Sequence, residues 1–211
     1  MSPSALSNAD GRRSPAWGAD LPVDEADARS RLLDAAEQCY AELGPSRTKM
    51  AHIATRAGIH RTTIYSYFRN RDEVLTACYL RAASIVLEAA ETCWTTDSPF
   101  IDQLVDACVV GISVARDLPA MRAMIDRNEL PYAQTVAAAS EAWRSRLYEA
   151  FGRRLAAAAA AGAVRTDVTA ETQAQWVVRI CISLTVEPGR PEDGGDRAVL
   201  QAFLPRCVMP L

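Results

Sequence analysis

The 211-residue chain has few of the residues that build metal and redox sites. It contains two histidines, and its six cysteines form no CxxC pair. Two histidines without nearby carboxylate or thiolate partners make a poor metal site, and these cysteine spacings fit neither zinc ligation nor a disulfide framework. We therefore expect no metal and no cofactor. The cysteines are interpreted as small buried side chains in a reducing compartment, with a thiol sensor as the alternative: Cys39, Cys78, Cys93, Cys108, Cys181 and Cys207.

Long apolar runs are also missing. No segment approaches the roughly 18 apolar residues of a membrane-spanning helix. Residues 1–22 contain no apolar stretch of the kind found in secretion signals. These absences predict a cytoplasmic protein without a membrane partner.

Enzyme motifs are scarce as well. Residues 111–115, GISVA, come close to the GxSxG nucleophile elbow, but an elbow follows a strand and precedes its histidine. This segment has helical periodicity instead, and both histidines, His52 and His60, lie before it. The chain has no GxGxxG motif and no Walker loop. We therefore expect a protein that is not an enzyme.

Helical periodicity dominates the rest of the chain, and no segment alternates as a strand would. Residues 1–23 are rich in Ser, Pro, Ala, Asp and Gly without a period, which predicts a disordered tail. Beyond it, proline or polar residues mark the starts of most long helices, predicted at residues 24–43, 71–95, 99–116, 119–128, 131–161, 170–186 and 194–208. The predicted fold class is all-α.

Residues 48–67 are predicted to form two short helices joined by a tight turn at Gly58, which is the helix-turn-helix arrangement. Thr48 is expected to cap the first helix, and the second runs from about residue 60 to 67 with Ile64 and Phe68 turned inward. In this arrangement the second helix enters the major groove of DNA.

Positive charge is concentrated in the same region. The whole chain has 23 basic and 26 acidic residues, yet residues 44–71 contain no acidic residue and six basic ones, namely Arg47, Lys49, Arg56, Arg61, Arg69 and Arg71. A short cationic window in an acidic protein suits a polyanionic partner, with a solvated basic face as the alternative.

The second short helix has a polar outer side. With Ile64 and Phe68 buried, Thr62 and Ser66 point outward at about 100° per residue, and Thr63, Tyr65 and Tyr67 lie beside them. An arginine can donate two hydrogen bonds to guanine, threonine can contact bases, and hydroxyls and helix N-termini hold phosphates. The predicted DNA-binding residues are Thr48, Lys49, Arg61, Thr62, Thr63, Tyr65, Tyr67 and Arg71, with packing as the alternative for the two tyrosines.

This region resembles the DNA-binding domain of the tetracycline-repressor (TetR) family. The residues that carry the resemblance are Tyr40, Gly44, Thr48, Met50, Ile53, Ala54, Ala57, Gly58, Ile64, Tyr65, Tyr67, Phe68, Arg71 and Leu75. The resemblance implies base contacts from residues 61–63, and phosphate contacts from Thr48, Tyr65, Tyr67 and Arg71. It also implies a homodimer that binds an operator and a small-molecule effector. His60 departs from the usual small hydroxyl residue, which weakens the expected cap of the second helix, and Arg71 replaces the usual lysine.

The C-terminal half is expected to supply dimerisation and ligand binding. Residues 175–189 resemble the penultimate helix of such proteins, and their nearly all-round apolar surface has to be covered on several sides. The predicted dimerisation residues are Trp176, Val177, Ile180, Cys181 and Leu184. The predicted ligand-binding residues, each with core packing as the alternative, are Trp94, Met121, Met124, Ile125, Trp143, Tyr148 and Trp176.

Taken together, the sequence predicts a DNA-binding domain at residues 24–71 and a ligand-binding and dimerisation domain at residues 72–211. The expected function is that of a transcriptional regulator, a repressor released from a palindromic operator by a small apolar or aromatic effector. The alternative is a helical small-molecule-binding or cysteine-based redox regulator with another role.

Overall fold

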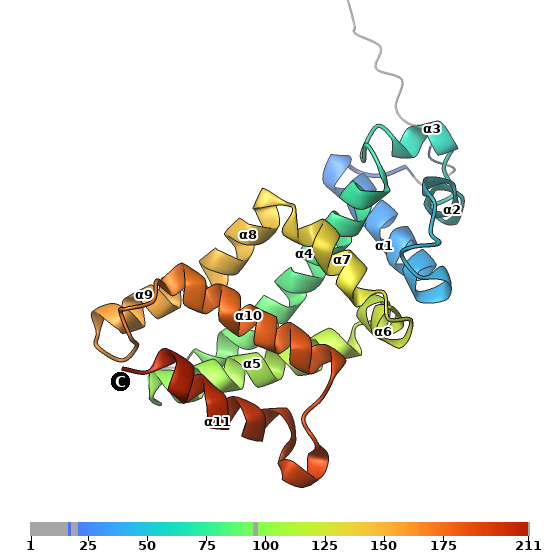
Figure 1. Cartoon of the computed structure of the whole chain (residues 1–211). Helices are drawn as coiled ribbons and strands as arrows, with labels where there is room; N and C mark the ends of the chain where they lie inside the picture. The colour runs from blue at the N-terminus through green and yellow to red at the C-terminus, as the bar shows by residue number, and fades with distance from the viewer. Residues whose placement is uncertain (1–16, 18–20, 95–96, 211) are drawn as a thin grey trace, which may run out of the picture.

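The computed structural model describes residues 17, 21–94 and 97–210. These residues are helical nearly throughout, and Figure 1 shows a small helical bundle at one end and a larger one at the other. The helices are α1 (Glu25–Leu43), α2 (Met50–Arg56), α3 (Arg61–Ile64), α4 (Arg71–Ala90), α5 (Phe100–Asp117), α6 (Pro119–Asp126), α7 (Leu130–Ala138), α8 (Glu141–Leu147), α9 (Arg153–Ala160), α10 (Ala170–Val186) and α11 (Gly195–Val208). Shorter turns are η1 (Glu91–Cys93), the π-helical η2 (Tyr148–Gly152) and η3 (Pro191–Asp193). The predicted all-α fold is confirmed.

Helix α1 shows how local sequence sets the boundaries. The Asp24 side chain accepts a hydrogen bond from the Asp27 backbone N–H and caps the N-terminus. Gly44 ends the helix with φ +81°, a left-handed conformation that glycine adopts without strain, and its N–H donates to the Tyr40 carbonyl. The next segment therefore leaves the helix axis and begins the helix-turn-helix.

The first hydrophobic core joins α1, α2, α3 and the N-terminal half of α4 to α6 and α7. Its largest fully buried side chains include Tyr40, Ile53, Ile64, Phe68 and Leu75. Because α6 and α7 take part, this core extends across the boundary at residue 71. The division into domains at that residue stays a prediction.

A second core lies among α5, η2, α9, α10 and α11. Leu104, Ile112, Leu155, Leu200 and Leu204 are fully buried there. Helix α4 also packs along α5, so one helix runs from the first core to the second (Figure 1).

The single helix predicted at residues 131–161 is wrong. The structure divides it into α7, α8, η2 and α9. The break falls at Ala139 and Ser140, where Ser140 N–H still bonds to Ala137 and a new helix begins at Glu141. Alanine and serine carry no strong stop signal, so helix propensity alone does not locate this break. The break lets α7 pack against α4 in the first core while η2 and α9 pack against α10 in the second.

The predicted tail also needs correction at one position. Residues 1–16 and 18–20 lie outside the described residues, but Trp17 is 8% exposed and forms an antiparallel bridge with Ile59. Trp17 is therefore part of the first core. None of the helices in the described ranges is both long and apolar enough to span a bilayer.

Candidate nucleic-acid interface

The turn between α2 and α3 positions the second short helix. Gly58 has φ +69° with no atom near a hypothetical Cβ, so backbone conformation, not space, favours glycine there. His60 then caps α3, because its Nδ1 accepts from the Thr62 N–H at 3.4 Å and lies 2.8 Å from the Thr62 hydroxyl. His60 therefore does cap α3, through a long hydrogen bond. Ile64 and Phe68 are fully buried and fix the inner side of the segment.

The outer side of α3 and the following turn is polar. Arg61, Thr62 and Ser66 are exposed, and Tyr65 is 45% exposed, which is unusual for so large a ring. Lys49 at the start of α2 is exposed as well. This surface offers a guanidinium, an ammonium and several hydroxyls, which are the donors that DNA bases and phosphates accept.

The six basic residues of the window fall into two groups. Arg56 pairs with Glu42 and donates to Gln38, Arg47 donates to the Leu43 carbonyl at 2.9 Å, and Arg71 donates to the Ser46 carbonyl and the Tyr132 hydroxyl. These three arginines contribute to the fold. Among the described residues no carboxylate pairs with the other three, which are Lys49, Arg61 and Arg69.

Two predicted contact residues lie inside the molecule. Thr63 is 6% exposed, because α3 is a single turn whose inner half covers Thr63 and Ile64 together. Thr48 is 0% exposed, and its hydroxyl donates to the Gly44 carbonyl at 2.8 Å. Lys49, not Thr48, is the N-cap residue of α2. The side chains of Thr48 and Thr63 therefore do not reach the polar surface.

Tyr67 and Trp17 form a contact that the sequence did not predict. The two rings meet edge to face with centroids 6.1 Å apart, and the Trp17 indole N–H donates to the Tyr67 hydroxyl at 3.4 Å. Arg29 donates to the Tyr67 carbonyl at 2.5 Å and lies over the Phe68 ring. Trp17 was missed because a lone tryptophan in a Ser/Pro-rich stretch has no periodic partner to reveal that it is buried.

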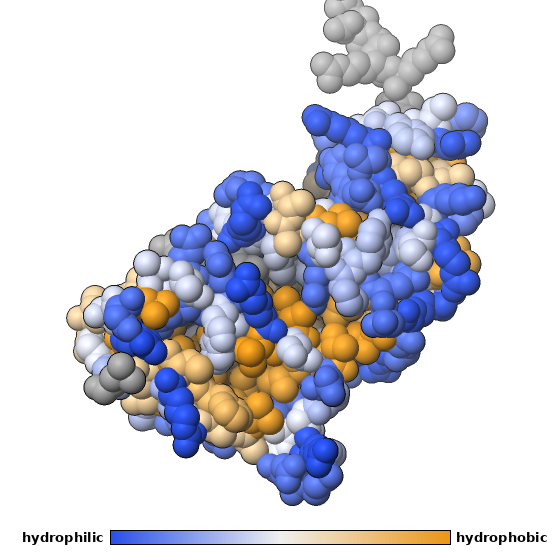
Figure 2. Space-filling model, in the orientation of Figure 1, coloured by the Kyte–Doolittle hydropathy of each residue, from blue (hydrophilic) through white to orange (hydrophobic). Residues whose placement is uncertain are grey.

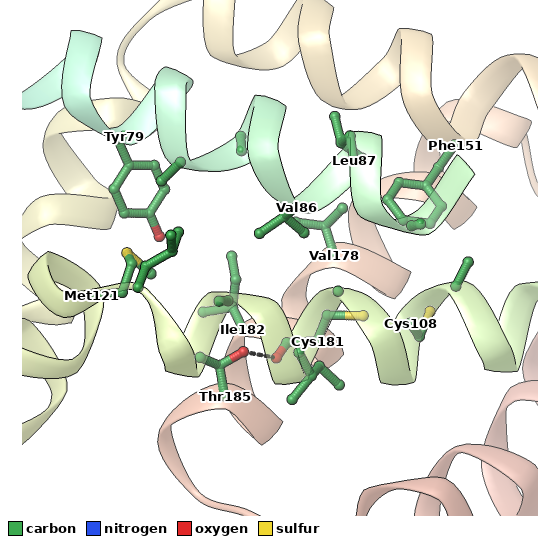
Figure 3. Close-up of a pocket in the computed structure, with 18 of the residues that line it drawn as sticks. Tyr79, Val86, Leu87, Cys108, Met121, Phe151, Val178, Cys181, Ile182 and Thr185 are labelled. Carbon is green, nitrogen blue, oxygen red and sulfur yellow. Dashed lines mark hydrogen bonds between the residues drawn. The ribbon is translucent and has the colours of Figure 1, made fainter. Parts of the chain in front are cut away.

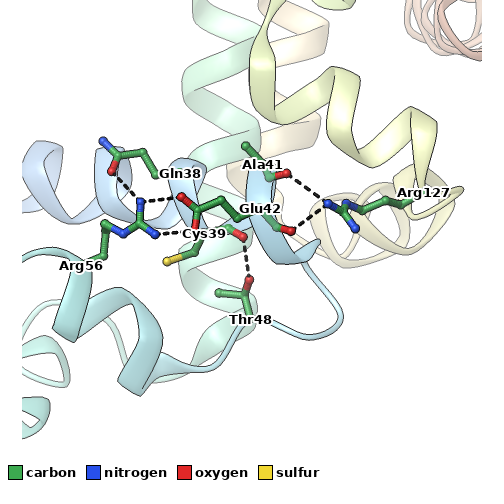
Figure 4. Close-up of polar contacts among 7 residues, drawn as sticks. All are labelled: Gln38, Cys39, Ala41, Glu42, Thr48, Arg56 and Arg127. Atoms are coloured by element: carbon green, nitrogen blue, oxygen red, sulfur yellow. Dashed lines mark hydrogen bonds and ion pairs between the residues drawn. The ribbon is translucent and has the colours of Figure 1, made fainter.

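The corner between α6 and α7 is tied to the helix-turn-helix by polar contacts. Arg127 donates to the carbonyls of Ala41 and Glu42 at 3.2 and 2.8 Å, near the end of α1 (Figure 4). The Glu129 carboxylate accepts from the N–H and the hydroxyl of Ser46 at 3.0 and 2.7 Å. The C-terminal region therefore contacts the loop that leads into α2 directly.

An apolar cavity of about 110 Å³ lies between α4, α5 and α10 (Figure 3). Aliphatic and aromatic side chains such as Val86, Phe151 and Ile182 line it, together with small residues such as Ala83 and Gly111. Of the predicted ligand-binding residues whose side chains the structure describes, only Met121 and Trp143 line this cavity. The small lining residues were missed because alanine and glycine give no sequence signal for a cavity.

The other predicted ligand-binding residues have different positions. Trp94 stacks on Phe100, with ring centroids 6.1 Å apart, and Trp176 packs partly buried against the second core. Met124 and Ile125 belong to the first core. These residues belong to the core or its rim. The sequence assigned them to the ligand site because helical periodicity does not distinguish a cavity wall from the packed interior. The Tyr148 side chain lies outside the described residues.

Cys108 and Cys181 both line the cavity. A hydrogen bond with Cys181, burial and nearby thiols raise the pKa of Cys108, and burial raises the pKa of Cys39 and Cys78. Because the thiolate is the reactive form, a raised pKa lowers the reactivity of these three thiols. In the described part of the chain no cluster of His, Cys, Asp or Glu could hold a metal ion.

The predicted dimerisation residues are divided by the structure. Val177 is 0% exposed and Leu184 is 8% exposed, so both pack within the second core, and Cys181 faces the cavity. Trp176, Ile180 and Cys181 are partly exposed. The all-round apolar character of α10 is explained by contacts with α5, η2 and α9 on the inside.

A helix-turn-helix with a cationic, hydroxyl-rich second helix, attached to a larger helical bundle, defines a DNA-binding regulator. Residues 32–78 match the model of "Bacterial regulatory proteins, tetR family". An uncharacterized HTH-type transcriptional regulator of Mycobacterium tuberculosis, MT1294, is 30% identical over 192 residues, which cover 87% of this chain and 86% of the relative. The chain belongs to the TetR family of transcriptional regulators, a family without enzymatic activity.

Solved structures share the fold. A TetR-family protein from Shewanella sp. PV-4 aligns with a TM-score of 0.66 at 16% identity, covering 87% of this chain and 98% of its own. SmeT, the repressor of the SmeDEF multidrug efflux pump of Stenotrophomonas maltophilia, aligns with a TM-score of 0.59 at 21% identity, covering 86% and 90%. At these identities the likeness shows the arrangement of helices alone.

Replacing Arg61 with alanine is expected to weaken operator binding by about 1–3 kcal/mol and to relax the preference for bases at its position. The reason is that Arg61 is exposed at the start of α3 without a described acidic partner. Affinity and footprints on an operator selected from random sequence would measure both effects. Arg122→Ala, an exposed arginine on α6, is the control. Unchanged affinity and footprints would remove Arg61 from the base-reading residues.

Replacing Trp17 with alanine is expected to lower the free energy of unfolding by about 2 kcal/mol, because a buried ring and its contact with Tyr67 are lost. Urea denaturation followed by circular dichroism measures this change. Trp17→Phe keeps the ring contact without the N–H donor and should retain most of the stability. A Trp17→Ala variant as stable as the parent chain would show that Trp17 does not stabilise the first core.

Proposed function

We propose that this DNA-binding regulator is a repressor whose operator is released when a small apolar molecule enters the cavity between α4, α5 and α10. The observation that carries the proposal is that α4 lines the cavity with Ala83 and Val86, and continues into the first core with Val74 and Leu75. A molecule larger than the cavity has to displace α4 or its neighbours, and so moves the helix-turn-helix.

The composition of the cavity supports an apolar effector. Apart from Thr185, the Tyr79 hydroxyl and the Trp143 indole N–H, its lining side chains consist of carbon and sulfur groups. Burial of an apolar ligand there gains about 25 cal/mol per Å² of apolar surface removed from water. SmeT, whose fold is similar at 22% identity and a TM-score of 0.55, has been solved in complex with triclosan. An aromatic, weakly polar effector is consistent with this comparison.

Two copies of the chain would read one operator. A dimer that places its recognition helices about 34–36 Å apart binds successive major-groove faces of a near-palindromic site. We place the dimer interface on α10 and α11, because Phe203 is 59% and Val186 is 41% exposed and Ile180 is partly exposed. Figure 2 shows an apolar band over this part of the molecule. Such a patch on a soluble protein marks an interaction surface.

Operator binding in the presence of an apolar ligand tests the proposed release. Triclosan and 1-octanol are expected to weaken operator affinity of the parent chain and to have little effect on Ala83→Phe, whose added ring occupies the cavity. By reciprocity, operator DNA should lower the affinity for either ligand by the same factor. Fluorescence anisotropy with labelled operator and calorimetry with ligand measure the two halves. Ligand binding that leaves operator affinity unchanged would contradict the proposal.

Replacing Phe203 with aspartate is expected to give monomers, because the interface would then bury an unpaired charge at a cost of several kcal/mol. Light scattering coupled to size exclusion measures the mass. Ile85→Asp is the matched control, since Ile85 is 42% exposed on α4, away from α10 and α11. A dimeric Phe203→Asp protein would place the interface elsewhere.

A further inference from the structure

A polar pocket that is open to solvent adjoins the apolar cavity. Its volume is about 490 Å³, and it lies between the C-terminal end of α4 and the segment α8–η2–α9. We call it the polar annex, and define it by its charged lining residues Glu91, Arg146, Glu149, Arg153 and Arg154. Nothing in the predicted function of the protein accounts for three arginines gathered at this place.

The annex and the apolar cavity share a wall. Leu87 lines both, and the π-helical turn η2 contributes Phe151 to the apolar cavity and Glu149 and Ala150 to the annex. Figure 3 shows Leu87 and Phe151 together at one end of the apolar cavity. Single π-helical turns are rare and occur often at functional sites. A ligand in the apolar cavity therefore has the annex at this end.

The arginines of the annex are not equally engaged. Arg154 is held by both carboxylate oxygens of Glu91 at 2.8 Å, by the Ala150 carbonyl at 2.6 Å, and by the Trp94 ring. Its charge is thus compensated inside the protein. Glu91 is compensated as well, which leaves Arg146, Arg153 and one carboxylate.

The remaining carboxylate does not balance the two other arginines. Arg153 lies 3.5 Å from Glu149 in an exposed pair, which is weak in water. Arg146 donates to the Ser84 hydroxyl at 3.4 Å, and among the side chains that the structure describes no carboxylate pairs with it. The annex therefore has one positive charge in excess and two guanidinium groups able to turn toward an anion.

We propose that the effector is an amphipathic anion, with its apolar body in the cavity and a carboxylate at Arg146 and Arg153. Guanidinium groups bind carboxylates through paired hydrogen bonds, and the apolar chamber takes the part of the molecule that water excludes. This inference rests on the proposed ligand site and adds the chemistry of the head group to it. Because Leu87 lines both pockets, the carboxylate has to pass this side chain to reach the arginines.

Octanoate and 1-octanol are the matched probes, because they share a chain and differ in the charged end. Calorimetry on the parent protein is expected to give octanoate a roughly threefold to tenfold lower Kd, the size expected for a partly exposed charge-assisted contact. In Arg146→Gln/Arg153→Gln this preference should disappear while the affinity for 1-octanol is retained. Arg122→Gln, an exposed arginine paired with Asp117 on another face, should keep the preference.

The preference is also expected to shrink as ionic strength rises, since exposed charges are screened.

Equal Kd values for the two probes in the parent protein would overturn the inference and leave the annex as a solvated set of ion pairs. If both probes bind equally and still release operator, the inference fails and the proposed function stands. If octanoate binds preferentially without affecting operator affinity, the annex is a ligand site and the proposed release is wrong. If neither probe binds, both proposals are overturned. Thermal unfolding of the variants is the folding control, and an unchanged transition shows that they are folded.

Discussion

Helix α4 is packed into both hydrophobic cores, and the rest of the structure depends on that constraint. Its N-terminal half buries Val74 and Leu75 against the helix-turn-helix, and its C-terminal half presents Val86 and Leu87 to the cavity. A helix of 20 residues is about 30 Å long and stiff, so its two ends cannot move independently. Whatever changes the spacing between α4 and α5 therefore changes the position of α3.

The contacts around α6 and α7 make a second connection of a different kind. Arg127 and Glu129 reach the end of α1 and its following loop through hydrogen bonds at the protein surface. Exposed polar contacts of this kind contribute about 0–1 kcal/mol each, so they break and re-form easily. Close-packed apolar contacts, in contrast, resist deformation. The combination of a stiff core helix with weak surface contacts suits a two-state shift of the DNA-binding part relative to the cavity.

The sequence predicted the parts of the protein that depend on periodicity. Turn residues and buried positions such as Gly58 and Ile64 located the helix-turn-helix, because a three-residue or four-residue repeat and a glycine are visible in one dimension. The predicted outward position of Thr63 is wrong, because a helical wheel assumes a regular helix, whereas α3 is one turn that packs on the core. The predicted N-cap at Thr48 is wrong, because its hydroxyl donates to the Gly44 carbonyl in the preceding turn and does not cap the next helix. The sequence did not predict the cavity walls, because alanine and glycine show no periodicity that marks a cavity. It did not predict the burial of Trp17 either, because this residue is isolated.

The partition of charge explains how an acidic chain binds a polyanion with selectivity. Acidic and polar partners hold Arg56 and Arg71 in the fold, so Lys49, Arg61 and Arg69 near α3 are the basic residues of the window that we propose for DNA contacts. Each phosphate neutralised adds about 0.9 to the salt slope of binding, so few free cations make non-specific binding weak. In the proposed dimer, tight binding would then require base contacts from two copies at once. In that dimer a change in the spacing of the two α3 helices would remove most of the affinity, so the proposed release would need only a small displacement of α4.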